Sequence, residues 1–186
     1  MRIIAGEWKR RPLRAPPGDA TRPTSDRVRE TLFSMLISRI GDFEGLRVAD
    51  LFAGSGALGL EALSRGASSC LFVEQDPVAI RALRTNISAL QAQTRCDVRA
   101  SSVLTLGPAK EPLDLLLLDP PYGTGAGAVA LERLARLGWI GPATWCALEV
   151  AAAEEVRLKA LEVESERKVG PARLVLLRLR QPSAQP

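Results

Sequence analysis

A short glycine-rich segment gives the first indication of chemistry in this sequence. Residues 46–51 form an apolar run of the length expected for a buried strand of a parallel sheet. Gly54, Gly56 and Gly59 follow, and a helical pattern then resumes. Glycines between a strand and a helix let the backbone approach a ligand and present amide groups to it. The spacing therefore predicts a nucleotide-like ligand but does not identify it.

Asp50 narrows the choice of ligand. Its carboxylate precedes Gly54 by four residues and falls at the carboxyl end of the expected strand. It would repel a pyrophosphate and attract a ligand that carries ammonium and sulfonium groups, such as S-adenosylmethionine. The alternative is a structural Asp50 that stabilises the turn. On the first interpretation, the cofactor-binding residues of this segment are Asp50, Phe52, Ala53, Gly54, Ser55 and Gly56.

A second candidate site follows the apolar run 113–118. Asp119 offers a carboxylate, two prolines fix the Pro120 carbonyl outward, and Tyr122 adds a flat ring. Two acceptors and a stacking surface fit an exocyclic amine of a base, whose lone pair can then face an electrophilic methyl group. A structural turn is the alternative for Asp-Pro-Pro alone. In a doubly wound sheet this site shares a crevice with the glycines. The predicted catalytic residues are Asp119, Pro120, Pro121 and Tyr122.

Two further carboxylates follow the next expected strand, residues 70–73. Glu74 lies twenty residues beyond Gly54, where a carboxylate meets ribose hydroxyls in nucleotide-binding folds. Asp76 precedes Pro77, the pattern of a helix N-cap followed by proline at the first helical position. We therefore expect Glu74 to hold a ribose, with Asp76 as the weaker candidate.

Positive charge is concentrated near the N-terminus. Residues 1–29 hold eight basic and three acidic side chains, whereas the remainder holds 17 basic and 18 acidic ones. This distribution indicates a polyanion-binding segment, with a solvated tail as the alternative. Ile3, Ile4, Trp8 and Leu13 interleave with the charges, so the segment can dock on the body and form short strands; Trp8 could stack on a base or pack in the core. The predicted RNA-binding residues are Arg2, Lys9, Arg10, Arg11, Arg14, Arg22 and Arg27.

These sites require a scaffold of alternating strands and helices. Further strands are expected at 97–103, 113–118 and 145–150, and helices at 24–38, 77–90 and 126–137. Residues 163–169 and 173–179 resemble an antiparallel hairpin. The alternation predicts an α/β fold with a doubly wound, mostly parallel sheet. We expect a basic extension over residues 1–25, one catalytic domain over 26–182 and a tail over 183–186.

The composition excludes several protein classes. The chain has 186 residues, of which 46% are apolar and 25% charged, as expected for one globular domain. Its apolar runs are too short to span a bilayer, and residues 1–6 lack the pattern of a signal peptide. We therefore expect a cytoplasmic monomer with no membrane partner. Three widely spaced cysteines indicate buried free thiols, and the absence of histidine argues against a metal site and a histidine base.

These motifs together carry a family resemblance. The glycine segment with Asp50 and Glu74, combined with the Asp119–Tyr122 site, resembles class I S-adenosylmethionine-dependent methyltransferases that modify exocyclic amines. Residues 2–8, 22–30 and 50–66 resemble, more narrowly, the RsmD family. Members of that family are bacterial enzymes that methylate the 2-amino group of one guanine in small-subunit (16S) ribosomal RNA. The resemblance covers nearly the whole chain.

The resemblance implies a Rossmann-like seven-stranded sheet, S-adenosylmethionine as cofactor, and an RNA substrate presented on a partly assembled small subunit. The chain departs from the family at the end of the third strand. An Asp or Asn near the adenine is usual there, and this chain has Ser101 and Ser102. Their hydroxyls could supply the same hydrogen bond, so both are assigned to the cofactor site.

Three other functions remain compatible with parts of the pattern. The glycine spacing alone permits an NAD-dependent oxidoreductase, which Asp50 and the Asp119–Tyr122 site argue against. The basic extension alone permits a non-catalytic RNA-binding assembly factor. Among methyltransferases, an adenine-N6 enzyme acting on RNA or DNA is the nearest alternative, because the same four-residue site serves both amines.

Overall fold

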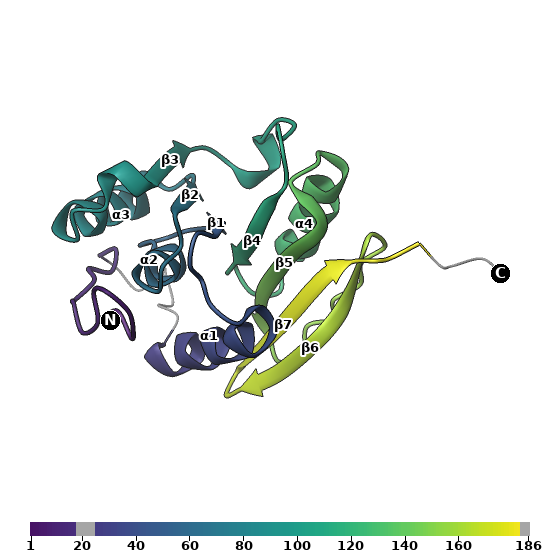
Figure 1. The fold of residues 1–186 in the computed structure, drawn as a ribbon. Coiled ribbons are helices and arrows are strands. Elements are labelled where there is room, and N and C mark those ends of the chain that lie inside the picture. The colour runs from purple at the N-terminus through teal and green to yellow at the C-terminus, as the bar shows by residue number, and fades with distance from the viewer. Residues whose placement is uncertain (18–24, 183–186) are drawn as a thin grey trace.

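The computed structural model describes residues 1–17 and 25–182, and within them the chain forms one seven-stranded sheet (Figure 1). The strand order is β3-β2-β1-β4-β5-β7-β6. Neighbours are parallel from β3 through β5, β7 runs antiparallel to β5, and β6 pairs antiparallel with β7. The predicted doubly wound sheet with a terminal hairpin is confirmed. The strands are β1 (Arg47–Leu51), β2 (Ser69–Glu74), β3 (Cys96–Ala100), β4 (Leu113–Leu118), β5 (Ile140–Ala151), β6 (Leu161–Val169) and β7 (Ala172–Leu179).

Helices cover both faces of the sheet. The helices are α1 (Asp26–Ile40), α2 (Ala57–Ser64), α3 (Pro77–Ala89) and α4 (Ala126–Arg136), with 3-10 turns η1 (Gln93–Arg95) and η2 (Val103–Thr105). Apolar side chains of α1, α2 and α3 share one core, whereas those of α4 and η2 belong to a second core on the opposite face. Local chemistry sets the helix starts, because Ser25 caps α1 and Asp76 caps α3 ahead of Pro77.

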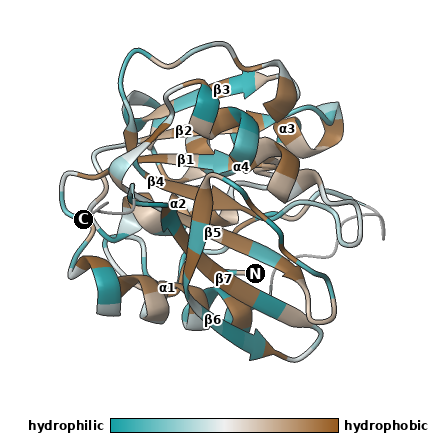
Figure 2. Cartoon of the chain, turned by 90° about the vertical axis from the view of Figure 1, so that its right-hand side faces the viewer, coloured by the Kyte–Doolittle hydropathy of each residue, from teal (hydrophilic) through white to brown (hydrophobic). Residues whose placement is uncertain are grey.

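Burial on both faces explains the apolar strand sequences. Leu115 to Leu118 of β4 are all buried, as expected for a central parallel strand. Figure 2 shows hydrophobic colouring along the central strands and more hydrophilic colouring on the edge strand β6. In the described part of the chain, no helix is long and apolar enough to cross a bilayer.

Two expected strands differ from the structure by more than two residues at one end. The third strand was expected to continue to Val103, but β3 ends at Ala100. The Ser102 hydroxyl accepts the Leu104 N–H at 3.2 Å, and this cap starts η2 instead. The fifth strand begins at Ile140, five residues before the expected start, because Ile140 pairs with Leu113 at the beginning of β4; the register then shifts before Trp145 pairs with Leu115.

The N-terminal segment folds onto the body of the protein. Ile3, Trp8 and Leu13 are buried in the same core as α1 and α2, so this segment is not a solvated tail. The expected short strands are reduced, within the described residues, to one bridge between Arg2 and Pro12. Residues 1–17 are called the extension below; Figure 1 places them beside α2 and α3.

A buried carboxylate anchors the extension. Glu61 of α2 is fully buried and accepts the N–H groups of Ile4 at 2.8 Å and Ala5 at 3.0 Å. Arg65 pairs with the same carboxylate at 2.8 Å. Ser64 adds two bonds, accepting from the Trp8 N–H at 3.0 Å and donating to the Ala5 carbonyl at 2.6 Å. Every polar atom of this buried anchor thus has a partner that offsets its desolvation.

The three cysteines are free, as predicted, but they are not equally buried. Cys70 and Cys146 are buried, whereas Cys96 is only partly so. Burial raises the pKa of all three thiols, that of Cys96 to about 12. The thiols therefore stay protonated near neutral pH and have little nucleophilic character.

Candidate active site

A cavity of about 500 Å³ lies where β1, β2 and β4 end. The glycine segment follows β1 and the Asp119–Tyr122 segment follows β4, and these strands are neighbours with Leu51 opposite Leu118. The two predicted sites therefore share one crevice, as expected at the carboxyl edge of a doubly wound sheet. The predicted residues that line the cavity are Asp50, Phe52, Ala53, Gly54, Ser55, Glu74, Asp76, Ser101, Ser102, Asp119, Pro120, Pro121 and Tyr122.

Residues 52–56, called the glycine loop below, have a constrained backbone. Gly54 and Gly56 adopt φ values of +56° and +83°, and Phe52 adopts +62° although it is not a glycine. A left-handed conformation costs a residue with a side chain roughly 1–2 kcal/mol. The neighbouring Ala53 N–H donates to the Val73 carbonyl at 3.0 Å and fixes the turn against β2. Phe52 is thus held in a strained conformation on the cavity wall, as is common at functional sites.

Gly56 is the one glycine-loop residue that does not line the cavity. A Cβ built on it would lie 2.3 Å from Leu83 Cδ1 of α3, so its small size serves the packing of the loop on that helix. Gly59 has a similar packing role, because a Cβ there would lie 2.4 Å from the Phe72 ring. The assignment of Gly56 to cofactor binding stays a prediction, without support from the cavity lining.

Glu74 organises the loops around it. Its Oε2 accepts the Gly54 N–H at 2.8 Å, and its Oε1 accepts the N–H groups of Gln75 at 2.8 Å and Asp76 at 2.9 Å. A carboxylate has about four lone-pair sites, so it can still accept from a ligand hydroxyl. Asp76 has less accepting capacity left for a ligand, since its Oδ1 accepts the Val78 N–H at 2.9 Å as the cap of α3.

Asp50 is a buried carboxylate at the base of the cavity. It is 1% exposed and accepts the Gly59 N–H at 2.8 Å. Burial raises its pKa well above the usual value; the bond from Gly59 opposes that shift, and the charges of Asp119 and Glu74 add to it. Three carboxylates around one cavity create a negative potential that disfavours phosphate and favours a cationic ligand.

The Asp119–Tyr122 segment is supported by contacts that the sequence does not reveal. The Tyr122 hydroxyl donates to Glu149 Oε1 at 2.7 Å, and Glu149 on β5 is only 2% exposed. Beyond the tyrosine, the Gly123 N–H donates to Glu154 Oε2 at 3.0 Å. These contacts restrain the tyrosine ring and the loop before any substrate arrives.

The predicted RNA-binding side chains are mainly on the surface of the extension. Arg2, Lys9, Arg10, Arg11 and Arg14 are exposed, and so is Arg27 in α1. Arg22 lies outside the described residues. Trp8 is buried, with the Arg95 guanidinium 5.3 Å from its ring centre, so it packs in the core and does not face a base.

Sequence patterns missed several residues that shape the site. Met1, Ala15 and Pro16 of the extension line the cavity, although they are far from the glycine loop in sequence. Asn86 of α3 is 2% exposed and bonds to both the extension and the loop. None of these residues belongs to a recognisable motif. The only local signal was a polar residue, Asn86, on the apolar face of the expected helix, between Leu83 and Leu90.

Comparison with known proteins places the chain in a family. The family model described as "Conserved hypothetical protein 95" matches residues 1–178. Ribosomal RNA small subunit methyltransferase D of Escherichia coli is 39% identical over 140 residues, covering 75% of this chain and 69% of the relative. The solved structure of the putative methyltransferase yhhF from Escherichia coli superposes with a TM-score of 0.83 at 32% identity, covering 96% and 97% of the two chains.

A more distant structure shows how general the fold is. The ribosomal protein L11 methylase of Lactobacillus delbrueckii has a TM-score of 0.68 at 17% identity, covering 95% of this chain and 90% of its own. Its likeness supports the class I methyltransferase fold alone. The family match and the nearer relatives go further: this chain has that fold and belongs to the family described as Conserved hypothetical protein 95.

Proposed function

We propose that this protein transfers a methyl group from S-adenosylmethionine to the 2-amino group of a guanine in small-subunit ribosomal RNA. The observation that carries the proposal is the shared cavity, which Asp119, Pro120 and Tyr122 line together with the glycine loop, Asp50 and Glu74. The relative named ribosomal RNA small subunit methyltransferase D supports the RNA substrate class.

The charge and shape of the cavity fit S-adenosylmethionine. Asp50, Glu74 and Asp119 are carboxylates on its wall, and burial and mutual repulsion raise the pKa of Asp50. A ligand with ammonium and sulfonium charges would relieve that repulsion, whereas a pyrophosphate would increase it. This argues against a dinucleotide and therefore against the oxidoreductase alternative.

The roles of the cofactor residues follow from their positions. Asp50 contributes negative charge, the Gly54 backbone offers close approach, and Glu74 accepts from ribose hydroxyls while it holds the loop. Ser101 is fixed by its N–H, which donates to the Glu74 carbonyl at 3.0 Å, so its side chain is available at the adenine end. S-adenosylmethionine, when bound, supplies an electrophilic methyl group.

The substrate residues act on the amine. Asp119 and the Pro120 carbonyl accept its two N–H groups, which draws the nitrogen lone pair out of conjugation with the base. Tyr122 stacks on the base and is restrained by Glu149. The proton leaves the nitrogen to Asp119 or to water. Since no covalent enzyme intermediate is needed, positioning and electrostatics supply most of the rate enhancement.

The guanine must leave its RNA fold to reach this cavity. Single-stranded or splayed bases are the usual targets of enzymes that act on a base edge. The exposed cations of the extension would hold the surrounding phosphates. We propose that a partly assembled small subunit presents the nucleotide better than free RNA, because assembled RNA holds the target in one conformation.

Methyl transfer with labelled cofactor tests the function. Deproteinised 16S ribosomal RNA and small subunits isolated from cells that lack the protein are incubated with enzyme, and nucleosides are then analysed by mass spectrometry. N2-methylguanosine supports the proposal. N6-methyladenosine would favour the adenine alternative, and no transfer to either substrate, with RNA still bound, would favour an assembly factor.

A further inference from the structure

The extension forms part of the cavity wall. Met1, Ala15 and Pro16 line the same cavity as the glycine loop, Glu74 and Asp119. The cavity is therefore complete only when the extension is docked on α2 and α3. The same segment carries Lys9, Arg10, Arg11 and Arg14, so one short piece of backbone connects the basic surface to the cofactor site.

Asn86 makes the connection between the extension and the glycine loop. Its Oδ1 accepts the Arg14 N–H at 2.8 Å, and its Nδ2 donates to the Arg14 carbonyl at 2.9 Å. The same Nδ2 donates to the Ser55 carbonyl at 3.0 Å. One amide, 2% exposed, therefore holds the backbone of both segments at a fixed separation.

This arrangement is costly to disturb. Burying an amide costs free energy unless its donors and acceptor are satisfied, and Asn86 satisfies them only while both segments are in place. The loop is also packed against α3 directly, because Gly56 meets Leu83 about one turn before Asn86. A displacement of Arg14 would thus remove partners from Asn86 and release its hold on Ser55.

Basic side chains of the extension lie next to this contact. The Arg14 side chain is exposed while its backbone is held by Asn86, and Arg11 Nη2 donates to the Ala89 carbonyl of the same helix at 2.6 Å. An RNA phosphate bound by these arginines would act on the backbone that closes the cavity.

We propose that Asn86 is a positioning residue that couples RNA binding on the extension to cofactor binding in the cavity. The inference rests on the proposed function, since it requires that both ligands bind. Each ligand favours the docked extension, so each tightens the other. Such coupling is reciprocal by thermodynamic necessity, and factors of about 5 to 150 are typical.

The test measures both affinities together. The dissociation constant of wild-type protein for deproteinised 16S ribosomal RNA is determined with and without saturating S-adenosylhomocysteine, which cannot donate a methyl group. We expect RNA to bind about fivefold more tightly in its presence, and the reciprocal titration to give the same factor. The variant Asn86→Asp keeps the acceptor for Arg14 and loses both donors, so its coupling factor should fall close to one.

Ser64→Ala is the matched control. It removes two hydrogen bonds from the extension at Trp8 and Ala5, but those bonds involve no atom of Arg14 or the glycine loop. It should retain the fivefold coupling even where it lowers the melting temperature. If Asn86→Asp keeps the wild-type coupling, or if Ser64→Ala loses as much, the inference is wrong, because a purely structural Asn86 would change stability alone.

A measurement on the wild type keeps the proposal testable if Asn86→Asp does not fold. S-adenosylhomocysteine should slow hydrogen exchange of the Arg14 amide, which donates to Asn86, by several-fold relative to the unliganded protein. Unchanged exchange at that amide overturns the inference. If both probes bind but neither affects the affinity for the other, the coupling is overturned and the proposed function stands. If the protein binds neither probe, the coupling and the proposed function are both overturned.

Discussion

Asp50 is the residue whose environment most clearly favours a cationic ligand. Its folded pKa is raised by burial and by the nearby Asp119 and Glu74, so its surroundings oppose the negative charge in the absence of a cationic ligand. Below the ordinary value of 3.8 its protonated form stabilises the fold, and this contribution is lost as pH rises through the raised folded pKa. Binding of the proposed cationic cofactor would lower that pKa and release a proton.

Cofactor affinity should therefore rise with pH between the pKa of Asp50 in the complex and its raised pKa in the free protein, by up to about tenfold per unit, and level off above the raised pKa. Asp50→Asn keeps an acceptor for the Gly59 N–H but does not titrate. It should bind S-adenosylmethionine more weakly with no such dependence, and should unfold at higher denaturant concentration without cofactor at neutral pH. Calorimetry across pH measures the first effect; an identical pH profile in the variant would contradict it.

Asp119 is the residue on which the proposed chemistry depends. Asp119→Asn preserves volume and one acceptor oxygen but removes the negative charge that would stabilise a developing ammonium. We expect single-turnover methylation to slow by about 10²–10³-fold, as for other preorganised electrostatic groups. S-adenosylmethionine affinity should change much less. A near-wild-type rate in the folded variant would contradict the proposed role of Asp119 in amine transfer.

At the level of elements, local patterns predicted most of the fold. The apolar run of β4, the caps of α1 and α3, and the hairpin of β6 and β7 have signals within a few residues, and the structure confirms them. The two candidate sites also came together, because strand ends share an edge. The course of the extension could not be predicted, since its contacts with Glu61 and Asn86 join residues 56 to 72 positions apart.

Docking of the extension on α2 depends on Gly6. Its φ is +85°, and an added Cβ would lie 1.8 Å from the Ser64 carbonyl oxygen. Gly6→Ala should lower the free energy of unfolding by about 1–3 kcal/mol, the scale of backbone strain, and more if the extension detaches. Denaturant unfolding measures stability, and trypsin sensitivity at Arg10 and Arg11 measures detachment.

Gly45→Ala is the control that separates the cost of backbone strain from the cost of a steric clash. Gly45 also has a positive φ, +74°, but an added Cβ would meet no atom within 4 Å. This variant should lower the free energy of unfolding through backbone strain alone and leave the extension protected from trypsin. Equal proteolysis of the two variants would mean that contact with Ser64 does not hold the extension in place.

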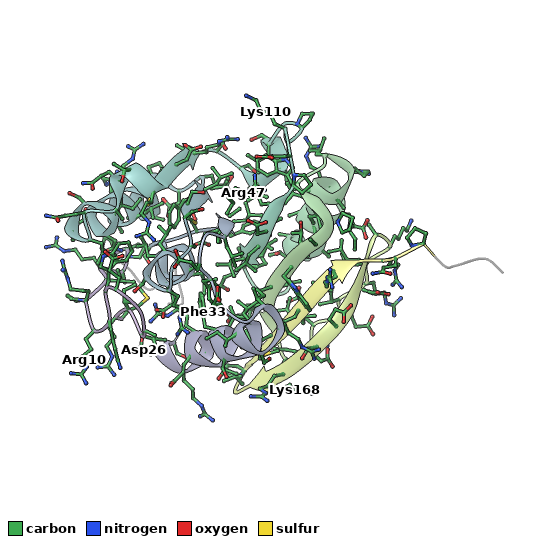
Figure 3. All side chains as sticks on the ribbon, viewed as in Figure 1. Arg10, Asp26, Phe33, Arg47, Lys110 and Lys168 are labelled. Carbon is green, nitrogen blue, oxygen red and sulfur yellow. The ribbon has the colours of Figure 1, made fainter. Side chains whose placement is uncertain are left out.

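For the whole molecule, the uneven charge distribution predicts how RNA binding depends on salt. In Figure 3, Arg10 of the extension points outward from one edge of the molecule, while Lys110 and Lys168 lie at other edges. Replacing Lys9 and Arg10 with Ala should reduce the slope of log affinity against log salt by up to about two, one for each lost phosphate contact. Arg11 is left intact because it bonds to α3.

The double variant Lys110→Ala and Lys168→Ala is the charge-matched control. It removes the same net charge from exposed positions away from the extension. Its salt slope should remain that of the wild type. If the two double variants reduce the slope equally, RNA binding depends on net charge alone, and the extension is not a specific RNA-binding segment.

The long-range docking of the extension also has a consequence for biosynthesis. Its first residues leave the ribosome long before their partners, since Glu61 and Asn86 are made only after 56 to 72 further residues. Until then no folded surface is present to cover Trp8 of the extension. The long loop between the extension and its partners Glu61 and Asn86 can close only after α2 and α3 have formed. The extension is thus made before its partners on α2 and α3 but docks only after them, and the cofactor cavity cannot close before it does.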